Sequence, residues 1–195
     1  MPNTQVTNTA TSLSSQFSWA FESDLGWIAI ATDGIEVTSL KFGYSSAENA
    51  IAKLDYASDS VLQSATPELK RWQKALQAYA AGSPVEIGEI PVRVAPADTF
   101  TGVVNRMCRE IPRGVVLTYG ALAEQAGSPR AARAVGNVMR TNRIPLLIPC
   151  HRVVAATGLG GYSGSGGSEL KQRLLAMENF PTVRPEQKKG VRLFN

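Results

Sequence analysis

The stretch "TYGALAEQAGSPRAARAVGNVMRTN", residues 118 to 142, predicts two helices joined by a tight turn. Residues 118–127 carry apolar side chains at helical spacing and end in a glycine, and residues 128–142 open with Ser128 as a cap and Pro129 in the first turn. Two helices joined in this way are typical of the helix-turn-helix, whose second helix contacts DNA. The same pattern also fits a helical hairpin that binds nothing.

The second predicted helix carries a polar, basic stripe along one face. Its members recur at i, i+3, i+7 and i+10, and they are Arg130, Arg133, Asn137 and Arg140. Ala134 lies beside the stripe, and its small side chain would let the helix approach a groove closely. The stripe fits either a basic face in solvent or a DNA contact, and we interpret it as a DNA contact.

The next segment, "RIPLLIPCHRVVAATG" over 143–158, places Cys150 beside His151, the single histidine of the chain. A thiol and an imidazole can act as nucleophile and base. Adjacent side chains of a strand point to opposite faces, so this pair can cooperate only if the backbone turns or a water links them. Pro149 favours an irregular backbone, because it fixes its own φ and restricts Ile148. From these residues alone, a structural histidine beside a buried cysteine stays open.

A glycine-rich loop and a helix follow the cysteine. The loop "GLGGYSGSGG", residues 158–167, can bring backbone N–H groups and Ser163 close to a ligand. It lacks the P-loop pattern of glycines followed by Lys and Ser or Thr, so it predicts no nucleoside triphosphate site. Residues 168–180 have the spacing of a helix and contain Glu178, which taken alone fits a surface position better than a catalytic one.

Ahead of the helix pair, residues 98–112 predict another helix, with Asp98 as its cap. Its apolar residues repeat at core spacing, and they are Phe100, Val103, Val104, Met107 and Cys108. We therefore expect Cys108 to pack in the core as a small hydrophobic residue.

The first part of the chain alternates like strands. "FSWAFES" (17–23) and "GWIAIATDGIEVTSLKFG" (26–43) predict an antiparallel meander with a hairpin turn at Asp33 and Gly34. Two helices are predicted after the meander, over 45–58 and over 66–82.

The chain is expected to fold as two domains that meet near residue 95. Residues 85–97 look like an extended linker that is broken by Pro91 and Pro96. The predicted organisation is a flexible tail over 1–15, an N-terminal α/β domain over 16–95, a mainly helical C-terminal domain over 96–180 and a basic tail over 181–195.

Charge is distributed unevenly along the 195 residues. Residues 1–100 contain six Lys and Arg against eleven Asp and Glu, whereas residues 101–195 contain fourteen against five. A basic second half suits a polyanionic partner, although solubility and chance would also explain it.

Composition argues against several classes of protein. No apolar run approaches the ~20 residues that span a bilayer, and the polar start lacks the features of a secretory signal. With two cysteines in all, we expect reduced thiols, a cytoplasmic protein and no membrane association. One histidine and two cysteines cannot supply the usual four ligands of a zinc site, so no metal is expected.

Several motifs together resemble the O6-alkylguanine-DNA alkyltransferases, also called methylated-DNA–protein-cysteine methyltransferases. In chain order the motifs are "IPRGVVLTYGALAEQAG", "SPRAARAVGNVMRTN", "IPCHRVV", "GYSG" and "LLAME". They fall within residues 98–180, and before residue 95 the resemblance is one of architecture alone. It implies a small N-terminal antiparallel sheet with helices, ribonuclease H-like, followed by a mainly α domain with a helix-turn-helix.

The resemblance assigns chemical roles to four residues. Cys150 would accept the alkyl group, His151 would remove its proton through a bridging water, and Glu178 would orient His151. Tyr119 would donate its hydroxyl to guanine N3 as the base leaves. The bridging water also answers the geometric objection to a cysteine next to a histidine.

Other matched residues would form the substrate pocket. Asn142 would brace the turn before the cysteine, and Tyr162 and Ser163 would line the pocket, with Ser163 near guanine O6. Backbone carbonyls around Cys150 and Val153 would read the guanine amino group.

The implied function is DNA repair by direct, irreversible alkyl transfer from O6-alkylguanine, and less so from O4-alkylthymine, in duplex DNA. The alkylated oxygen lies within a stacked base pair, so the base must be flipped out. Arg133 would fill the gap that it leaves, beside a DNA-binding face of Arg130, Ala134, Asn137 and Arg140. The product is a thioether, so the protein would act once per molecule, as a monomer and without a cofactor.

The sequence also departs from the family and leaves other functions open. Asn105 stands where the family commonly carries an apolar residue, and the loop that ends in "SGSGGSELK" is one or two residues longer than usual. A cysteine hydrolase would need an oxyanion hole and would not explain Arg133. The remaining alternatives are a non-enzymatic protein that recognises alkylated DNA, against which Cys150 argues, and a DNA-binding regulator.

Overall fold

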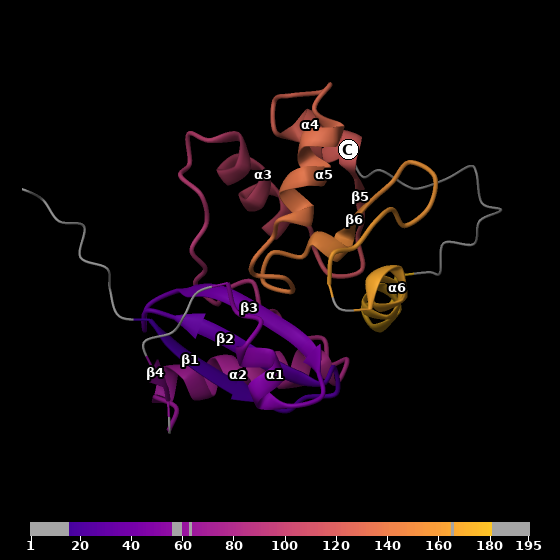
Figure 1. The fold of residues 1–195 in the computed structure, drawn as a ribbon. Helices are drawn as coiled ribbons and strands as arrows, with labels where there is room; N and C mark the ends of the chain where they lie inside the picture. Colours follow the sequence, from indigo (N-terminus) through magenta and orange to yellow (C-terminus); the bar gives the residue numbers. More distant parts are fainter. Residues whose placement is uncertain (1–15, 56–59, 63, 165, 181–195) are drawn as a thin grey trace, which may run out of the picture.

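A computed structural model describes residues 16–55, 60–62, 64–164 and 166–180 as an α/β fold in which a small sheet lies against a group of helices (Figure 1). The sheet and its two helices come from the first half of the chain, in indigo and purple, and the helices above them come from the second half. The tails predicted over 1–15 and 181–195 lie outside the described residues.

The sheet has the strand order β3-β2-β1-β4, formed by β1 (Phe17–Phe21), β2 (Trp27–Thr32), β3 (Val37–Tyr44) and β4 (Ser60–Val61). The first three strands pair antiparallel, which confirms the predicted meander. The turn between β2 and β3 is closed by Asp33, whose side chain accepts hydrogen bonds from the N–H groups of Ile35 and Glu36. β4 pairs parallel with β1 and was not predicted, because two residues leave no alternating pattern.

Two helices accompany the sheet. α1 (Ala47–Ile51) is shorter than the predicted 45–58, because the chain turns back after it and Asp55 pairs with β3 through Ser39 and Lys41. α2 (Pro67–Ala80) confirms the prediction, since the Thr66 side chain accepts from the N–H of Leu69 and caps the helix. Its buried face contains Leu69, Trp72, Leu76, Tyr79 and Ala80.

The sequence suggested an extended linker over residues 85–97. In the structure this segment is instead hydrogen-bonded to β3. Val92 forms a parallel bridge with Val37, the N–H of Val37 donates to the Pro91 carbonyl at 2.8 Å, and the N–H of Arg93 donates to the Val37 carbonyl at 2.9 Å. Ile87, Ile90 and Val92 are buried in a core that also includes side chains from both halves of the chain. The segment lies along the edge of β3 because its alternate apolar residues can be buried there.

The first three helices of the second half begin later than predicted. α3 (Phe100–Arg109) is capped by Thr99, which accepts from the N–H of Gly102, whereas Asp98 lies exposed outside the helix. α4 (Tyr119–Gln125) and α5 (Ala132–Arg140) pack together. The N–H of Ala131 donates to the Ser128 carbonyl, so residues 128–131 form a turn, and neither Ser128 nor Pro129 starts the helix.

Three short elements complete the described chain. β5 (Leu117–Thr118) pairs parallel with β6 (Val153–Val154), and a single 3-10 turn, Cys150–Arg152, leads into β6. α6 (Gly167–Met177) follows the glycine-rich loop, as predicted. No helix among the described residues is long and apolar enough to cross a membrane.

Gly102 lets α3 pass close to the preceding segment. A Cβ atom there would lie 2.0 Å from the Pro96 carbonyl oxygen and 2.6 Å from that of Ala95. Both contacts are backbone, which cannot rotate away, so Gly102→Ala is expected to reduce the free energy of unfolding by about 2 kcal/mol. Urea unfolding followed by circular dichroism measures this change.

The matched control is Gly136→Ala in α5, where a Cβ atom meets nothing within 4 Å. Alanine is a better helix former than glycine, so this variant should be more stable by about 0.5–1 kcal/mol. Equal effects of the two substitutions would contradict the steric argument.

Candidate active site

Cys150 lies in a turn between a buried apolar run and β6. Pro149 has φ −78° and ψ 64°, and Cys150, His151 and Arg152 form the 3-10 turn after it. The irregular backbone predicted at Pro149 is therefore confirmed. All three residues of the turn are buried, and Cys150 is 5 % exposed.

The side chain of Asn142 holds the segment that leads to this turn through two hydrogen bonds to its backbone. Its side-chain amide donates to the Ile148 carbonyl at 2.8 Å, and its oxygen accepts from the N–H of Ile144 at 3.0 Å. Burial raises the pKa of the Cys150 thiol, and a hydrogen bond from Asn142 and the charge of Lys171 partly oppose that rise. The resting thiol is therefore protonated and requires a base.

Glu178, at the C-terminal end of α6, binds His151 and Arg152. Its Oε1 lies 3.0 Å from His151 Nε2 and accepts from Arg152 Nη2 at 2.8 Å, and its Oε2 accepts from Arg152 Nε at 3.0 Å. Burial alone would raise the pKa of Glu178, but hydrogen bonds from His151 and Arg152 and the charge of Arg152 hold it well below its usual range. The carboxylate is ionised and can only accept hydrogen bonds.

This arrangement fixes the protonation of His151. Since Glu178 accepts at Nε2, the imidazole carries its proton there and leaves the lone pair on Nδ1. Nδ1 is buried and has no hydrogen-bond partner among the described residues. Burial lowers the pKa of His151, and its hydrogen bond to Glu178 only partly offsets this, so the ring is neutral and able to accept a proton at neutral pH.

Sequence reasoning missed a fourth member of the cluster. Tyr79, in the first half of the chain, donates its hydroxyl to Glu178 Oε1 at 2.5 Å and lies 3.4 Å from His151 Nε2. Helical spacing predicts that Tyr79 is buried, and a buried tyrosine usually finds a partner for its hydroxyl. The sequence carries no signal for which residue, 99 positions along the chain, that partner is.

Lys171 is another residue that the sequence analysis missed, as it also missed the Arg152 partner of Glu178. It is fully buried, and its ammonium donates to the Val153 carbonyl at 2.6 Å and to the Gly161 carbonyl at 3.3 Å. Burial lowers its pKa to about 8. Lys171 thus joins β6 to the glycine-rich loop.

A pocket of about 370 Å³ opens beside Cys150 toward α5. Its wall contains Tyr119, Met139, Arg140, Tyr162 and Ser163 as well as the cysteine. At Gly160, which has φ +69°, a Cβ atom would lie 3.0 Å from the Tyr119 ring, so the loop needs glycine to pass this close. We call this space the base pocket; Cys150 and residues of α5 both line it.

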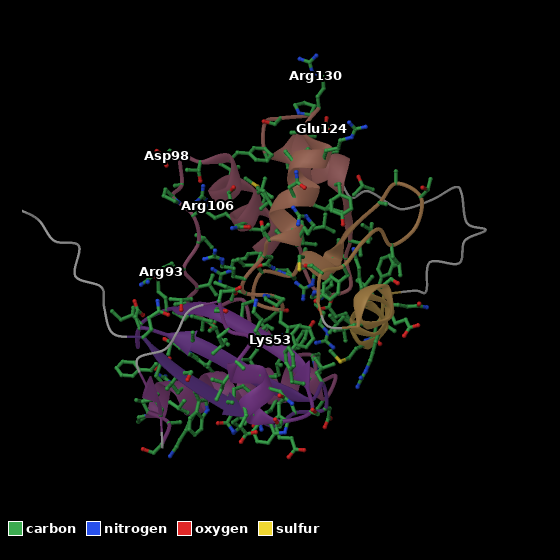
Figure 2. The ribbon with its side chains drawn as sticks, in the orientation of Figure 1. Lys53, Arg93, Asp98, Arg106, Glu124 and Arg130 are labelled. Atoms are coloured by element: carbon green, nitrogen blue, oxygen red, sulfur yellow. The ribbon has the colours of Figure 1, made fainter. Side chains whose placement is uncertain are left out.

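The basic stripe lies on the exposed side of α5, next to the mouth of the base pocket. Arg133, Ala134, Asn137 and Arg140 are exposed, and Arg140 also lines the pocket. Arg130 is exposed too, but it belongs to the turn before α5 and projects from the outer end of the helical part (Figure 2).

Two predicted pocket residues lie elsewhere. Val153 is fully buried, does not line the base pocket, and has its carbonyl bonded to Lys171. Asn142 lines a neighbouring hollow rather than the base pocket. Among the described residues, no group of three or more His, Cys, Asp or Glu could hold a metal ion.

Comparison with known proteins shows the family to which this chain belongs. Residues 99–180 match the family described as 6-O-methylguanine DNA methyltransferase, DNA binding domain. A methylated-DNA–protein-cysteine methyltransferase of Methanopyrus kandleri is 42 % identical over 106 residues, which are 54 % of this chain and 77 % of that protein. The chain belongs to the methylated-DNA–protein-cysteine methyltransferase family.

Other members of this methyltransferase family differ in how much they share with the chain. The rat protein is 47 % identical over 93 residues, 47 % of this chain, but the chain spans only 44 % of its length. The crystal structure of the Mycobacterium tuberculosis O6-methylguanine methyltransferase matches with a TM-score of 0.67 and 30 % identity, over 84 % of this chain and 92 % of that one. The fold likeness therefore extends into the first half, where the sequence motifs do not.

Proposed function

We propose that this methyltransferase-family protein repairs duplex DNA by moving the alkyl group of O6-alkylguanine to Cys150. The observation that carries the proposal is the position of the Cys150 sulfur, which borders the base pocket next to a neutral, buried imidazole. That imidazole has a free lone pair on Nδ1. A relative of similar fold, the Mycobacterium tuberculosis protein, has been crystallised with DNA.

The proposed chemistry begins with proton removal. A water passes the Cys150 proton to His151 Nδ1, while Glu178 and Tyr79 hold the ring from the other side. The thiolate then attacks the alkyl carbon in line with the carbon–oxygen bond. The sulfur–carbon bond forms, the carbon–O6 bond breaks, and its electron pair leaves with the guanine.

Tyr119 stabilises the departing base. In this proposal its hydroxyl donates to guanine N3 as charge develops there, which is supported by the position of Tyr119 in the wall of the base pocket. Tyr162 and Ser163 complete the walls, and the buried Tyr162 hydroxyl has no partner among the described residues. The thioether product is stable, so each molecule acts once and needs no cofactor.

On DNA, the α4–α5 pair acts as a helix-turn-helix. The exposed stripe of α5 contacts the phosphates, and Arg133 enters the base stack in place of the flipped nucleotide. In this proposal a monomer with an N-terminal domain over 16–95 and a C-terminal domain over 96–180 binds the lesion in the cytoplasm.

Arg133→Ala tests the base-flipping role. Its loss should slow repair of O6-methylguanine in duplex DNA about 100-fold, because the cost of unstacking is a few kcal/mol. Reaction with free O6-benzylguanine, which needs no flipping, should change less than about threefold. Single-turnover rates on the two substrates measure the difference.

The control for this variant is Arg71→Ala, which removes an equal charge from the exposed side of α2. It should leave both rates almost unchanged. Equal losses on both substrates with Arg133→Ala would contradict the proposed role.

Intact-protein mass spectrometry tests the function as a whole. The protein is mixed with a short duplex that holds one O6-methylguanine, and a gain of one methyl group that stops at one equivalent is expected. Peptide mapping should place it on Cys150, with the buried Cys108 unmodified as an internal control. Tight, lesion-selective binding without any gain in mass would replace the proposal with a damage-recognition protein.

A further inference from the structure

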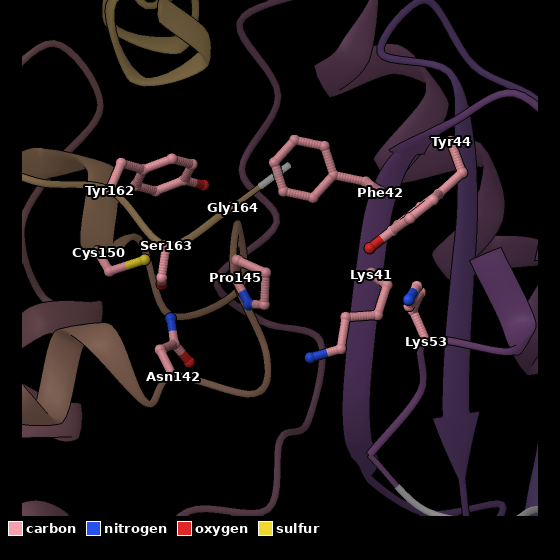
Figure 3. A pocket seen from close by; sticks show the side chains of 10 residues that line it. All are labelled: Lys41, Phe42, Tyr44, Lys53, Asn142, Pro145, Cys150, Tyr162, Ser163 and Gly164. Carbon is pink, nitrogen blue, oxygen red and sulfur yellow. The ribbon is translucent and has the colours of Figure 1, made fainter. Parts of the chain in front are cut away.

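A second hollow meets the base pocket at the reactive sulfur. It has a volume of about 220 Å³ and lies between β3 and the segment that carries Cys150 (Figure 3). Cys150, Tyr162 and Ser163 line both spaces. We call this second space the interface pocket, because its far wall belongs to the first half of the chain.

The proposed reaction needs free space in this direction. The thiolate attacks the carbon from the side opposite O6, so anything attached to that carbon projects sideways from the sulfur–carbon–oxygen line. In the proposed complex the purine fills the base pocket, which Tyr119 and residues of α5 line. The interface pocket is a second space that Cys150 lines, so a longer alkyl group can extend into it.

The walls of the interface pocket are of mixed polarity. The side of Cys150 contains the polar Asn142 and Ser163 and the apolar Pro145, and the sheet side contains the buried, apolar Phe42 and three polar ends, which are Lys41, Tyr44 and Lys53. Figure 3 shows these three side chains across the gap from Cys150. These three polar ends suit an alkyl chain with a polar terminus better than a purely apolar group.

The polar end of the pocket is cationic. Lys41 forms an ion pair with Asp55 at 2.7 Å, which largely balances its charge. Lys53 is exposed and forms no salt bridge within the described residues, so its ammonium is available to a ligand. Tyr44 adds a hydroxyl that can donate a hydrogen bond. The net charge of this wall favours an anionic group.

We propose that the interface pocket receives the part of the alkyl group beyond the transferred carbon, and that Lys53 favours alkyl groups that end in a carboxylate. This inference rests on the proposed function and gives the first half of the chain a role in choosing the adduct. For O6-carboxymethylguanine, the sulfur–CH₂ bond forms, the CH₂–O6 bond breaks, and the carboxylate is unchanged. The product is S-carboxymethylcysteine at position 150.

The test compares three duplexes of one sequence, each with a single O6-methylguanine, O6-carboxymethylguanine or O6-carbamoylmethylguanine. The last two are almost the same size and differ in charge. The ratio of their transfer rates to Cys150 is measured by intact mass for the wild type, Lys53→Gln and Lys53→Glu. Lys70→Gln, an exposed lysine of α2 that does not line the pocket, is the matched control.

The wild type is expected to prefer the carboxymethyl adduct. Lys53→Gln should lower the carboxymethyl-to-carbamoylmethyl ratio about fivefold, the size expected for one partly screened charge, and Lys53→Glu should lower it further. The methyl rate should stay within about twofold in both variants, and Lys70→Gln should change nothing.

The remaining outcomes separate the two proposals. An unchanged ratio in both Lys53 variants, or an equal loss on all three adducts, would overturn the interface-pocket inference while methyl transfer upheld the proposed function. Failure of the wild type to accept an alkyl group from any of the three duplexes would overturn the proposed function and this inference with it.

Discussion

Cys150→Ser is expected to lose methyl transfer by at least about 10⁴-fold while it keeps lesion-selective DNA binding. A serine hydroxyl is far less acidic than a thiol, and a neutral imidazole such as His151 cannot ionise it to a useful extent. The substitution replaces one small side chain with another, so the pocket should still accept the flipped base. Single-turnover mass measurements give the transfer rate, and fluorescence anisotropy with an O6-methylguanine duplex gives the affinity.

The control for this variant is Cys108→Ala, because Cys108 is the other thiol and lies fully buried in the core. Burial raises the pKa of Cys108 well above its usual value, so it is a poor nucleophile. Its replacement should leave transfer intact and lower stability by about 1 kcal/mol. Methyl transfer to the Cys150→Ser protein would place the acceptor at another residue.

Glu178→Gln is expected to be the most destabilising substitution in the active site. The variant leaves the charge of Arg152, whose side chain is 8 % exposed, without its carboxylate partner. The free energy of unfolding should fall by about 3 kcal/mol. Transfer should slow about 100-fold in the protein that remains folded. An amide can present its N–H rather than its oxygen to His151, and the ring then adopts the wrong tautomer for accepting the cysteine proton.

The same variant has a predicted pH dependence. Because the folded pKa of Glu178 lies below the ordinary value of 4.5, the carboxylate adds stability above pH 4.5, and this is lost as the pH falls further. The unfolded chain binds that proton first, so stability rises with pH in this range. In Glu178→Gln the acid side of the stability curve should therefore be shallower than in the wild type.

Glu169→Gln on the first turn of α6 is the matched control, since Glu169 is exposed and has no ion pair within the described residues. Its stability should change by less than about 0.5 kcal/mol, and its acid limb should match that of the wild type. Chemical unfolding at several pH values measures both variants. An acid limb in Glu178→Gln as steep as that of the wild type would contradict the assignment.

Local patterns predicted the parts of the fold that short segments determine. Alternation gave β1 to β3, and Thr66 and Pro67 gave the start of α2, because each signal depends on residues within one turn or one strand. The predicted start of α5 was wrong because Ser128 and Pro129 also suit a turn. The hydrogen bond from the N–H of Ala131 closes that turn before the helix begins. Residues 85–97 were misjudged because nothing in their own sequence shows that β3 has an open edge.

The candidate site likewise contains residues that the sequence could predict and residues that it could not. Cys150, His151 and Glu178 could be named because they lie within one set of motifs, and the structure brings His151 and Glu178 into contact. Tyr79 and Lys171 could not be named, because their partners are fixed only when separate helices pack. The resemblance implied that the carbonyl of Val153 reads the guanine amino group, and in the structure this carbonyl accepts a hydrogen bond from Lys171.

The edge of β3 also helps to fix the position of the nucleophile Cys150. The N–H of Leu40 donates to the carbonyl of Arg143 at 2.9 Å, so the segment that begins at Asn142 and ends at Cys150 is anchored to a stiff frame. In-line displacement tolerates little misalignment, and preorganisation of this kind is a general requirement of such sites. The anchor is backbone to backbone and survives almost any change of side chain. Substitutions in the first half that preserve the backbone of β3 can therefore still leave the cysteine in its place.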